Sequence, residues 1–101
     1  SDFAFVSAAA QIALDADGRC ARAAIGIGAA TAVPLRLDAV ARALQGQRFD
    51  ESKVRDAVKA ALADVEPMAD LHASAEYRKR VAATLAVRAI ADAFNDAARR
   101  P

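Results

Sequence analysis

The stretch Ala21-Arg-Ala-Ala-Ile-Gly-Ile-Gly-Ala-Ala-Thr-Ala-Val-Pro-Leu-Arg-Leu37 separates a part of the chain with strand periodicity from a part with helical periodicity. Its first half alternates like a β-strand, and one face collects the apolar side chains of Ala21, Ala23, Ile25 and Ile27. Gly26 and Gly28 remove two side chains from the opposite face, which also holds Arg22. Glycine within a strand marks a bulge or a close backbone approach, so we predict a strand that bends here.

Pro34 has no N–H group to donate to a strand ladder, so pairing should stop there or the strand should lie at a sheet edge. The glycine pair Gly26 and Gly28 also invites comparison with a dinucleotide-binding loop. In that motif Thr31 would stand at the third glycine position, and Pro34 would interrupt the phosphate-binding helix. The residues therefore favour a bent strand over a phosphate loop.

Residues 3–14 predict a preceding strand with one continuously apolar face, which should meet the helices: Ala4, Val6, Ala8, Ala10, Ile12 and Leu14. Phe3 and Phe5 begin the other, mixed face. We expect these two rings either in the core at the end of the sheet or at the edge of a contact with protein outside the chain.

Asp15-Ala-Asp-Gly18 predicts a hairpin turn between the two strands, because Asp accepts local backbone hydrogen bonds and Gly readily adopts a positive φ. A calcium-binding loop also uses Asp-x-Asp-Gly. Its twelfth position, counted from Asp15, is Gly26 here instead of a bidentate Glu, which argues against calcium.

The second half of the chain predicts three helices. A short helix over Leu37–Gln45 ends at Gly46, and Asp50 is placed to cap a second helix, with Phe49 and Val54 spaced for a hydrophobic staple. The second helix ends at Glu66-Pro67 and carries one apolar stripe: Val54, Ala57, Val58, Ala61, Leu62 and Val65.

Ser74 is the expected N-cap of a third helix that runs to about Ala98 or Arg99, with Glu76 in its first turn. Two apolar sides are predicted on this helix, one formed by Tyr77, Val81 and Leu85, the other by Ala83, Val87, Ile90, Phe94 and Ala97. We therefore expect it to pack on the sheet with one half and on its neighbouring helices with the other.

The composition indicates one domain over residues 1–101 and excludes several function classes. A net charge of +1 gives no electrostatic reason to expect nucleic acid or an anionic membrane as a partner. The single cysteine, Cys20, cannot form an internal disulfide, which agrees with a reducing cytoplasm. The chain opens at Ser1 almost within a strand, so we expect a piece of a longer protein.

Few residues offer chemistry. His72 lies near Asp70 in a predicted loop without a second metal ligand, and Cys20 lies between Arg19 and Arg22, which would lower its pKa. The remaining candidates are Ser7 and Ser74, which lack an adjacent base, and an anion-binding arrangement of Tyr77, Arg78, Lys79 and Arg80. A surface histidine, a small buried cysteine and a solvated helix face explain these patterns more simply. We predict no catalytic, cofactor-binding or metal-binding residue in this chain.

Three ordered segments resemble the C-terminal domain of the FAD-binding medium subunit of molybdenum hydroxylases, the family of aerobic carbon monoxide dehydrogenase and the xanthine dehydrogenases. Asp2-Phe-Ala-Phe-Val-Ser7 is similar to a strand that begins DxA, and Ile25-Gly-Ile-Gly to Pro34-Leu-Arg36 is similar to LGxGxxxPTPxR. Asp70-Leu-His-Ala-Ser-Ala-Glu-Tyr-Arg78 resembles DxRASxEYR, with Leu85 and Arg88-Ala-Ile90 at the following LxxRAL. Ala32, Val33 and His72 depart from these motifs, which puts any role of those side chains in doubt.

The resemblance implies an α+β fold, with a small antiparallel sheet of three to four strands packed against three helices. It also implies that this domain follows a two-part FAD-binding region and holds no flavin itself. The implied partners are that FAD region, a large subunit with the molybdenum cofactor and a small subunit with iron–sulfur clusters. In isolation we expect a weak homodimer. A stand-alone α+β interaction module and a small enzyme using His72 and Asp70 are the alternatives.

Overall fold

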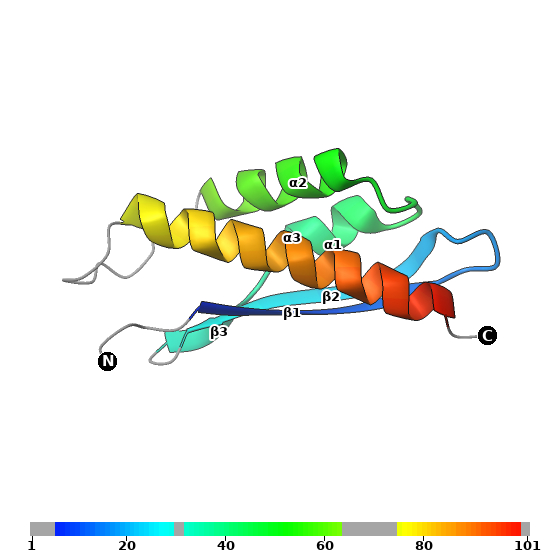
Figure 1. Cartoon of the computed structure of the whole chain (residues 1–101), viewed down its shortest axis with the longest axis horizontal. Coiled ribbons are helices and arrows are strands. Elements are labelled where there is room, and N and C mark those ends of the chain that lie inside the picture. The colour runs from blue at the N-terminus through cyan, green and yellow to red at the C-terminus, as the bar shows by residue number, and fades with distance from the viewer. Residues whose placement is uncertain (1–5, 30–31, 64–74, 100–101) are drawn as a thin grey trace.

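The computed structural model describes residues 6–29, 32–63 and 75–99, which form two layers (Figure 1). A sheet makes up one layer and all the described helices lie on the same side of it. The elements in chain order are β1 (Val6–Leu14), β2 (Cys20–Ala29), β3 (Ala32–Arg36), α1 (Asp38–Leu44), α2 (Glu51–Ala63) and α3 (Ala75–Arg99). The predicted α+β class and the antiparallel sheet packed on three helices are confirmed, with three strands within the described residues.

The sheet is antiparallel in the order β1-β2-β3, and β1 and β2 form the predicted hairpin. In its turn, one carboxylate oxygen of Asp15 accepts hydrogen bonds from the backbone N–H groups of Asp17 and Arg19, both at 2.9 Å. Gly18 has a φ of +81°, a conformation that strains residues with a Cβ. The local hydrogen bonds of Asp and the positive φ of Gly that we predicted for this turn are therefore confirmed.

The stretch around the two glycines differs from the single bent strand that we predicted. It contributes two antiparallel strands, β2 and β3, and Gly26 and Gly28 lie in regular register opposite Ala9 and Ser7. The pairing between β2 and β3 is irregular between Ile27 and Ala29, at Gly28, which agrees with the predicted irregularity at the glycine pair. Pro34 lies inside β3, an edge strand, where a missing N–H group is tolerated.

The core fills the space between the sheet and the helices. Ile25 from β2 belongs to the same buried cluster as side chains of α1 and α2, which recur with helical spacing: Val40 and Leu44, then Val54, Val58 and Leu62. Asp50 precedes α2, and its side chain accepts a hydrogen bond from the backbone N–H of Lys53 at 3.2 Å. The predicted cap and the described part of the predicted stripe are both confirmed.

The buried face of α3 was predicted in part, since Ile90 and Phe94 are buried as expected but Ala82 and Ala86 were not anticipated. Its fully packed stripe is Ala82, Ala86, Ile90 and Phe94, whereas Tyr77 is 52% exposed. The two alanines form the N-terminal half of this stripe, and such small residues allow α3 to pack closely on β1 (Figure 1). Phe49 packs on Phe94 with ring centroids 5.4 Å apart, a contact that the predicted staple with Val54 did not anticipate.

Candidate interaction surface

The face of the sheet that points away from the helices is open within the described part of the chain (Figure 1). We call it the open face. Its residues occupy alternate positions of the three strands, and most are alanine, glycine or serine: Ser7, Ala9, Gln11, Ala13, Arg22, Ala24, Gly26, Gly28 and Arg36. Such a surface is flat, since few side chains rise above the backbone.

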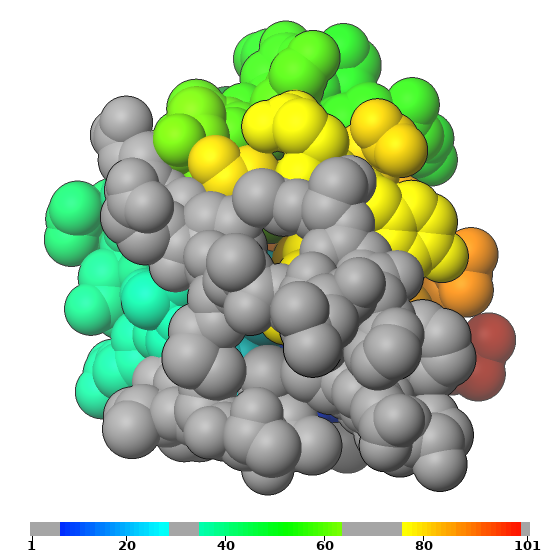
Figure 2. All heavy atoms as spheres, turned by 90° about the vertical axis from the view of Figure 1, so that its left-hand side faces the viewer, coloured from blue at the N-terminus to red at the C-terminus, as the bar shows by residue number. Residues whose placement is uncertain are grey.

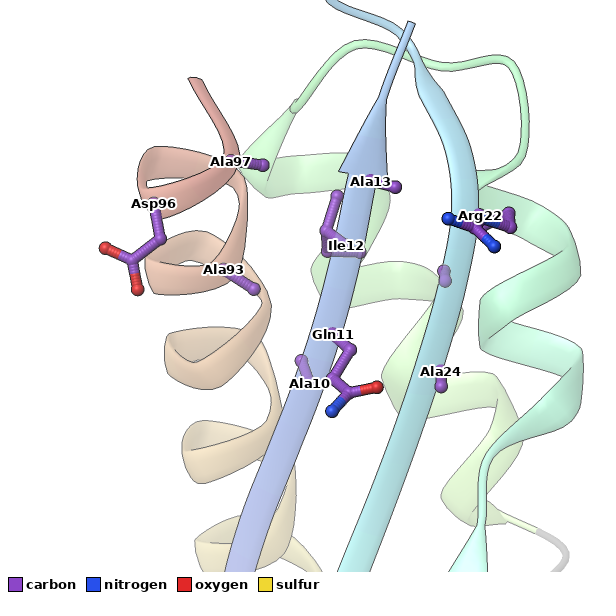
Figure 3. A pocket seen from close by; sticks show the side chains of 10 residues that line it. Ala10, Gln11, Ile12, Ala13, Arg22, Ala24, Ala93, Asp96 and Ala97 are labelled. Carbon is purple, nitrogen blue, oxygen red and sulfur yellow. The ribbon is translucent and has the colours of Figure 1, made fainter. Parts of the chain in front are cut away.

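Gln11 and Arg22 are the longer side chains at one end of the open face (Figure 3). Near them, a shallow hollow of about 590 Å³ extends from β1 and β2 to the last turns of α3, with Asp96 at its margin. Asp96 points away from the strands and forms no ion pair with Arg22 among the described residues. The hollow therefore lacks a paired acid and base.

Gly26 and Gly28 have no strong internal reason to be glycine. A Cβ placed on Gly26 would lie 3.6 Å from the carbonyl oxygen of Leu35, an ordinary van der Waals distance. At Gly28 the nearest atom is the Ser7 hydroxyl oxygen at 3.2 Å, which a rotation of the serine side chain can move. Because glycine weakens a strand, its use at such positions is typical of a close approach by another backbone.

Cys20 is buried, and its thiol donates a hydrogen bond to the carbonyl oxygen of Arg22 at 3.4 Å. Burial raises the pKa of this thiol, which is the opposite of the lowered value expected from the two neighbouring arginines. The Arg19 guanidinium instead donates to the carbonyl oxygen of Gly46 at 3.2 Å. Cys20 is therefore an unreactive core residue.

The other candidates within the described residues also have structural partners. Ser7 donates to the carbonyl oxygen of Gly28 at 3.4 Å, and Lys79 donates to that of Ala63 at 3.1 Å. The Arg80 guanidinium lies 6.0 Å from the centre of the Tyr77 ring. His72, Asp70, Ser74, Phe3 and Phe5 lie outside the described residues.

No group of three or more His, Cys, Asp or Glu side chains that could hold a metal ion occurs among residues 6–29, 32–63 and 75–99. In the same part of the chain, none of the helices combines the length and the apolar character needed to cross a bilayer.

The sequence model of one protein family, the CO dehydrogenase flavoprotein C-terminal domain, matches residues 1–93. The chain belongs to this family. A chain in the structure of quinoline 2-oxidoreductase from Pseudomonas putida 86 has 32% sequence identity and a TM-score of 0.84 to it, over 95% of this chain and 33% of that one. A chain of the Cu,Mo-CO dehydrogenase in a cyanide-inactivated form has 29% identity and a TM-score of 0.77, over 89% of this chain and 31% of that one.

Among curated proteins, the alpha subunit of the 6-hydroxypseudooxynicotine dehydrogenase complex from Paenarthrobacter nicotinovorans is 29% identical over 96 residues. That match spans 95% of this chain and 32% of the relative. This flavoprotein C-terminal domain therefore corresponds to about one third of the length of its relatives. The resemblance read from the three sequence segments is confirmed.

Sequence reasoning did not single out the open face as a functional surface. The signal was present, because the outward positions of β1 and β2 are almost all small. It could not be read without knowing that every described helix lies on one side of the sheet.

Proposed function

We propose that this flavoprotein C-terminal domain is a non-catalytic part of the FAD-binding subunit of a molybdenum hydroxylase. In this role its open face packs against the FAD-binding region of the same subunit. The family match and the CO dehydrogenase and quinoline oxidoreductase relatives support the setting. The two thirds of the relatives' length that this chain does not match provide room for the FAD-binding region.

The observation that carries the proposal is the construction of the open face. A sheet face that meets water is normally polar, whereas this one is mainly alanine and glycine. Gly26 and Gly28 remove side chains where the described fold would accommodate at least one of them. A closely packed neighbour accounts for both features, since small residues let two backbones approach.

In the parent complex, electrons would pass from the molybdenum cofactor of a large subunit, through the iron–sulfur clusters of a small subunit, to FAD. The domain would assist assembly of these subunits in the cytoplasm, and it would hold no flavin itself. The relatives support this arrangement, because they include a chain of the Cu,Mo-CO dehydrogenase and a subunit of a dehydrogenase complex. A stand-alone interaction module remains the alternative, and the open reading frame around Ser1 distinguishes the two.

The test is a chimera in which this chain replaces the matched third of the quinoline 2-oxidoreductase chain. Gly26→Leu in the chimera should lower the flavin content and the melting temperature, because the new side chain would separate the two packed surfaces. A matched variant, Gln47→Leu, places the same side chain at an exposed site outside the sheet and should leave both quantities unchanged.

Two results would contradict the proposal. If Gly26→Leu and Gln47→Leu gave the same flavin content and stability, the open face would not be the docking surface. If the isolated chain bound FAD in a saturable one-to-one complex at micromolar affinity, it would not be the flavin-free end of the subunit. Flavin fluorescence during titration, with sedimentation to detect the expected weak homodimer, measures the second outcome.

A further inference from the structure

A groove runs along the seam between α2 and α3, in the layer opposite the open face. The two helices lie side by side where α2 ends and α3 begins (Figure 2), and Lys79 bridges them there through its hydrogen bond to Ala63. The groove has a volume of about 840 Å³. It is lined from Glu51 to Ala63, the whole of α2, which gives a length of about 20 Å at 1.5 Å per residue.

The floor of this groove is apolar. Leu62 contributes from α2, and Ala83, Val87 and Ala91 contribute from successive turns of α3. Val87 is only partly buried against the core, so part of its surface remains available. A stripe of this kind suits the apolar face of another helix laid into the groove.

The rim of the groove is unbalanced in charge. Five cationic side chains line it, against the two carboxylates of Glu51 and Glu76: Arg55, Lys59, Lys79, Arg80 and Arg88. Glu51 is already paired with Arg55 at 2.5 Å. Lys59 and Arg88, from opposite helices, form no ion pair with any other described residue. Within the described residues, positive charge therefore lies without an ion-pair partner on both sides of an apolar floor.

We propose that this groove docks an acidic amphipathic helix of a partner protein. The partner's apolar stripe would contact Val87 and the alanines of α3, and carboxylates flanking that stripe would face Lys59 and Arg88. The groove length corresponds to a helix of about 14 residues. This second surface is independent of the open face, so the domain has one interface in each of its layers.

Two features favour a protein helix over other anionic partners. The chain as a whole carries a net charge of +1, without the extended basic field that phosphate backbones require. The charges also flank a concave apolar floor between two helices, whereas a bilayer surface would need a convex or flat contact. Charge and shape together match a single helix with acidic edges.

The experiment uses the 101-residue chain and a fluorescein-labelled helical probe peptide of about 14 residues, with leucines in one stripe and glutamates beside it. Fluorescence anisotropy measures the Kd. We expect saturable binding that the double variant Lys59→Glu/Arg88→Glu weakens by about tenfold or more, which corresponds to about 1.4 kcal/mol. Circular dichroism verifies that both proteins are folded.

The matched control is Lys53→Glu/Arg42→Glu, which changes the net charge identically at exposed positions outside the groove. Its Kd should stay within about twofold of the value for the unmodified chain. Charges away from the groove interact with the peptide only over longer distances, where salt screens them. Equal weakening by both double variants would reduce the effect to net charge and overturn the proposal. Equal binding of a scrambled peptide of the same composition, or tighter binding of a single-stranded oligonucleotide, would overturn it as well.

Discussion

The two faces of the sheet use apolar residues of different size. The face beneath the helices carries Ile12, Ile25 and Ile27 among its alanines, and these branched side chains reach into the core. The open face consists mainly of alanine, glycine and serine, with Gln11, Arg22 and Arg36 as its longer side chains. The two faces therefore differ in the size of their side chains as well as in polarity. Size separates them, because large side chains fill a core within the chain and small ones leave a flat surface for an external neighbour.

The largest expected contrast between the faces is in stability. Ile25 is 4% exposed, so Ile25→Ala should lower the free energy of unfolding by about 2–5 kcal/mol through lost burial and a residual cavity. Gln11→Ala on the open face should change it by less than about 0.5 kcal/mol. Urea denaturation of both variants measures the difference. Similar losses for the two would mean that the open face is also part of the core.

The helical cover over the inner face depends on the start of α2. Asp50→Ala should lower the free energy of unfolding by about 0.5–2 kcal/mol, because the backbone N–H of Lys53 loses its acceptor. Asp50→Ser should cost much less, since a serine hydroxyl accepts the same bond. Thermal melts compare the two variants. Equal losses of stability in Asp50→Ala and Asp50→Ser would show that Asp50 does not stabilise α2 by capping it.

Gly26→Ala tests directly whether the open face is built for something outside the fold. In the isolated chain it should stabilise by about 0.5–1 kcal/mol, because the added Cβ meets nothing closer than 3.6 Å and glycine is a poor strand residue. Gly18→Ala is the contrasting variant and should destabilise, since the φ of +81° suits glycine. A loss of stability in Gly26→Ala would show an internal requirement for that glycine.

The smallest expected effect concerns Cys20, at the covered end of β2. Its raised pKa means that the folded protein keeps the thiol proton to higher pH than the unfolded chain does. The folded state then binds more protons above the ordinary value of 9.0, so this contribution to stability is present below that pH and declines as pH rises beyond it. In Cys20→Ala the free energy of unfolding should fall less steeply between about pH 8 and about pH 10 than in the unmodified chain. If the two proteins lost stability equally steeply with pH, burial of Cys20 would not be raising its thiol pKa.

Local signals in the sequence were sufficient for most of the fold. The Asp15–Gly18 turn, the Asp50 cap and the stripe of Val54, Val58 and Leu62 each depend on residues close together in the chain. Contacts between distant segments were harder to predict. Ala82 and Ala86 were overlooked on α3 because their importance comes from the nearness of β1, which helical periodicity does not report.

The candidate surfaces follow the same rule. We predicted no catalytic residue because the sequence contains few side chains suited to catalysis, and such side chains can be counted without a structure. Each surface instead needs two elements to be placed in space. Lys59 and Arg88 are far apart in the chain and meet across the groove only because α2 packs on α3.

The packing of α3 against β1 has a consequence for synthesis of the protein. The first described strand, β1, and the last described helix, α3, are neighbours, so early and late parts of the described chain pack together (Figure 1). On a ribosome, the β1–β2 hairpin emerges early but lacks its cover until the turns around Ile90 and Phe94 have left the exit tunnel. Until then the inner face of the sheet lacks this part of its helical cover, and a stop codon that removes those turns would leave the core incomplete.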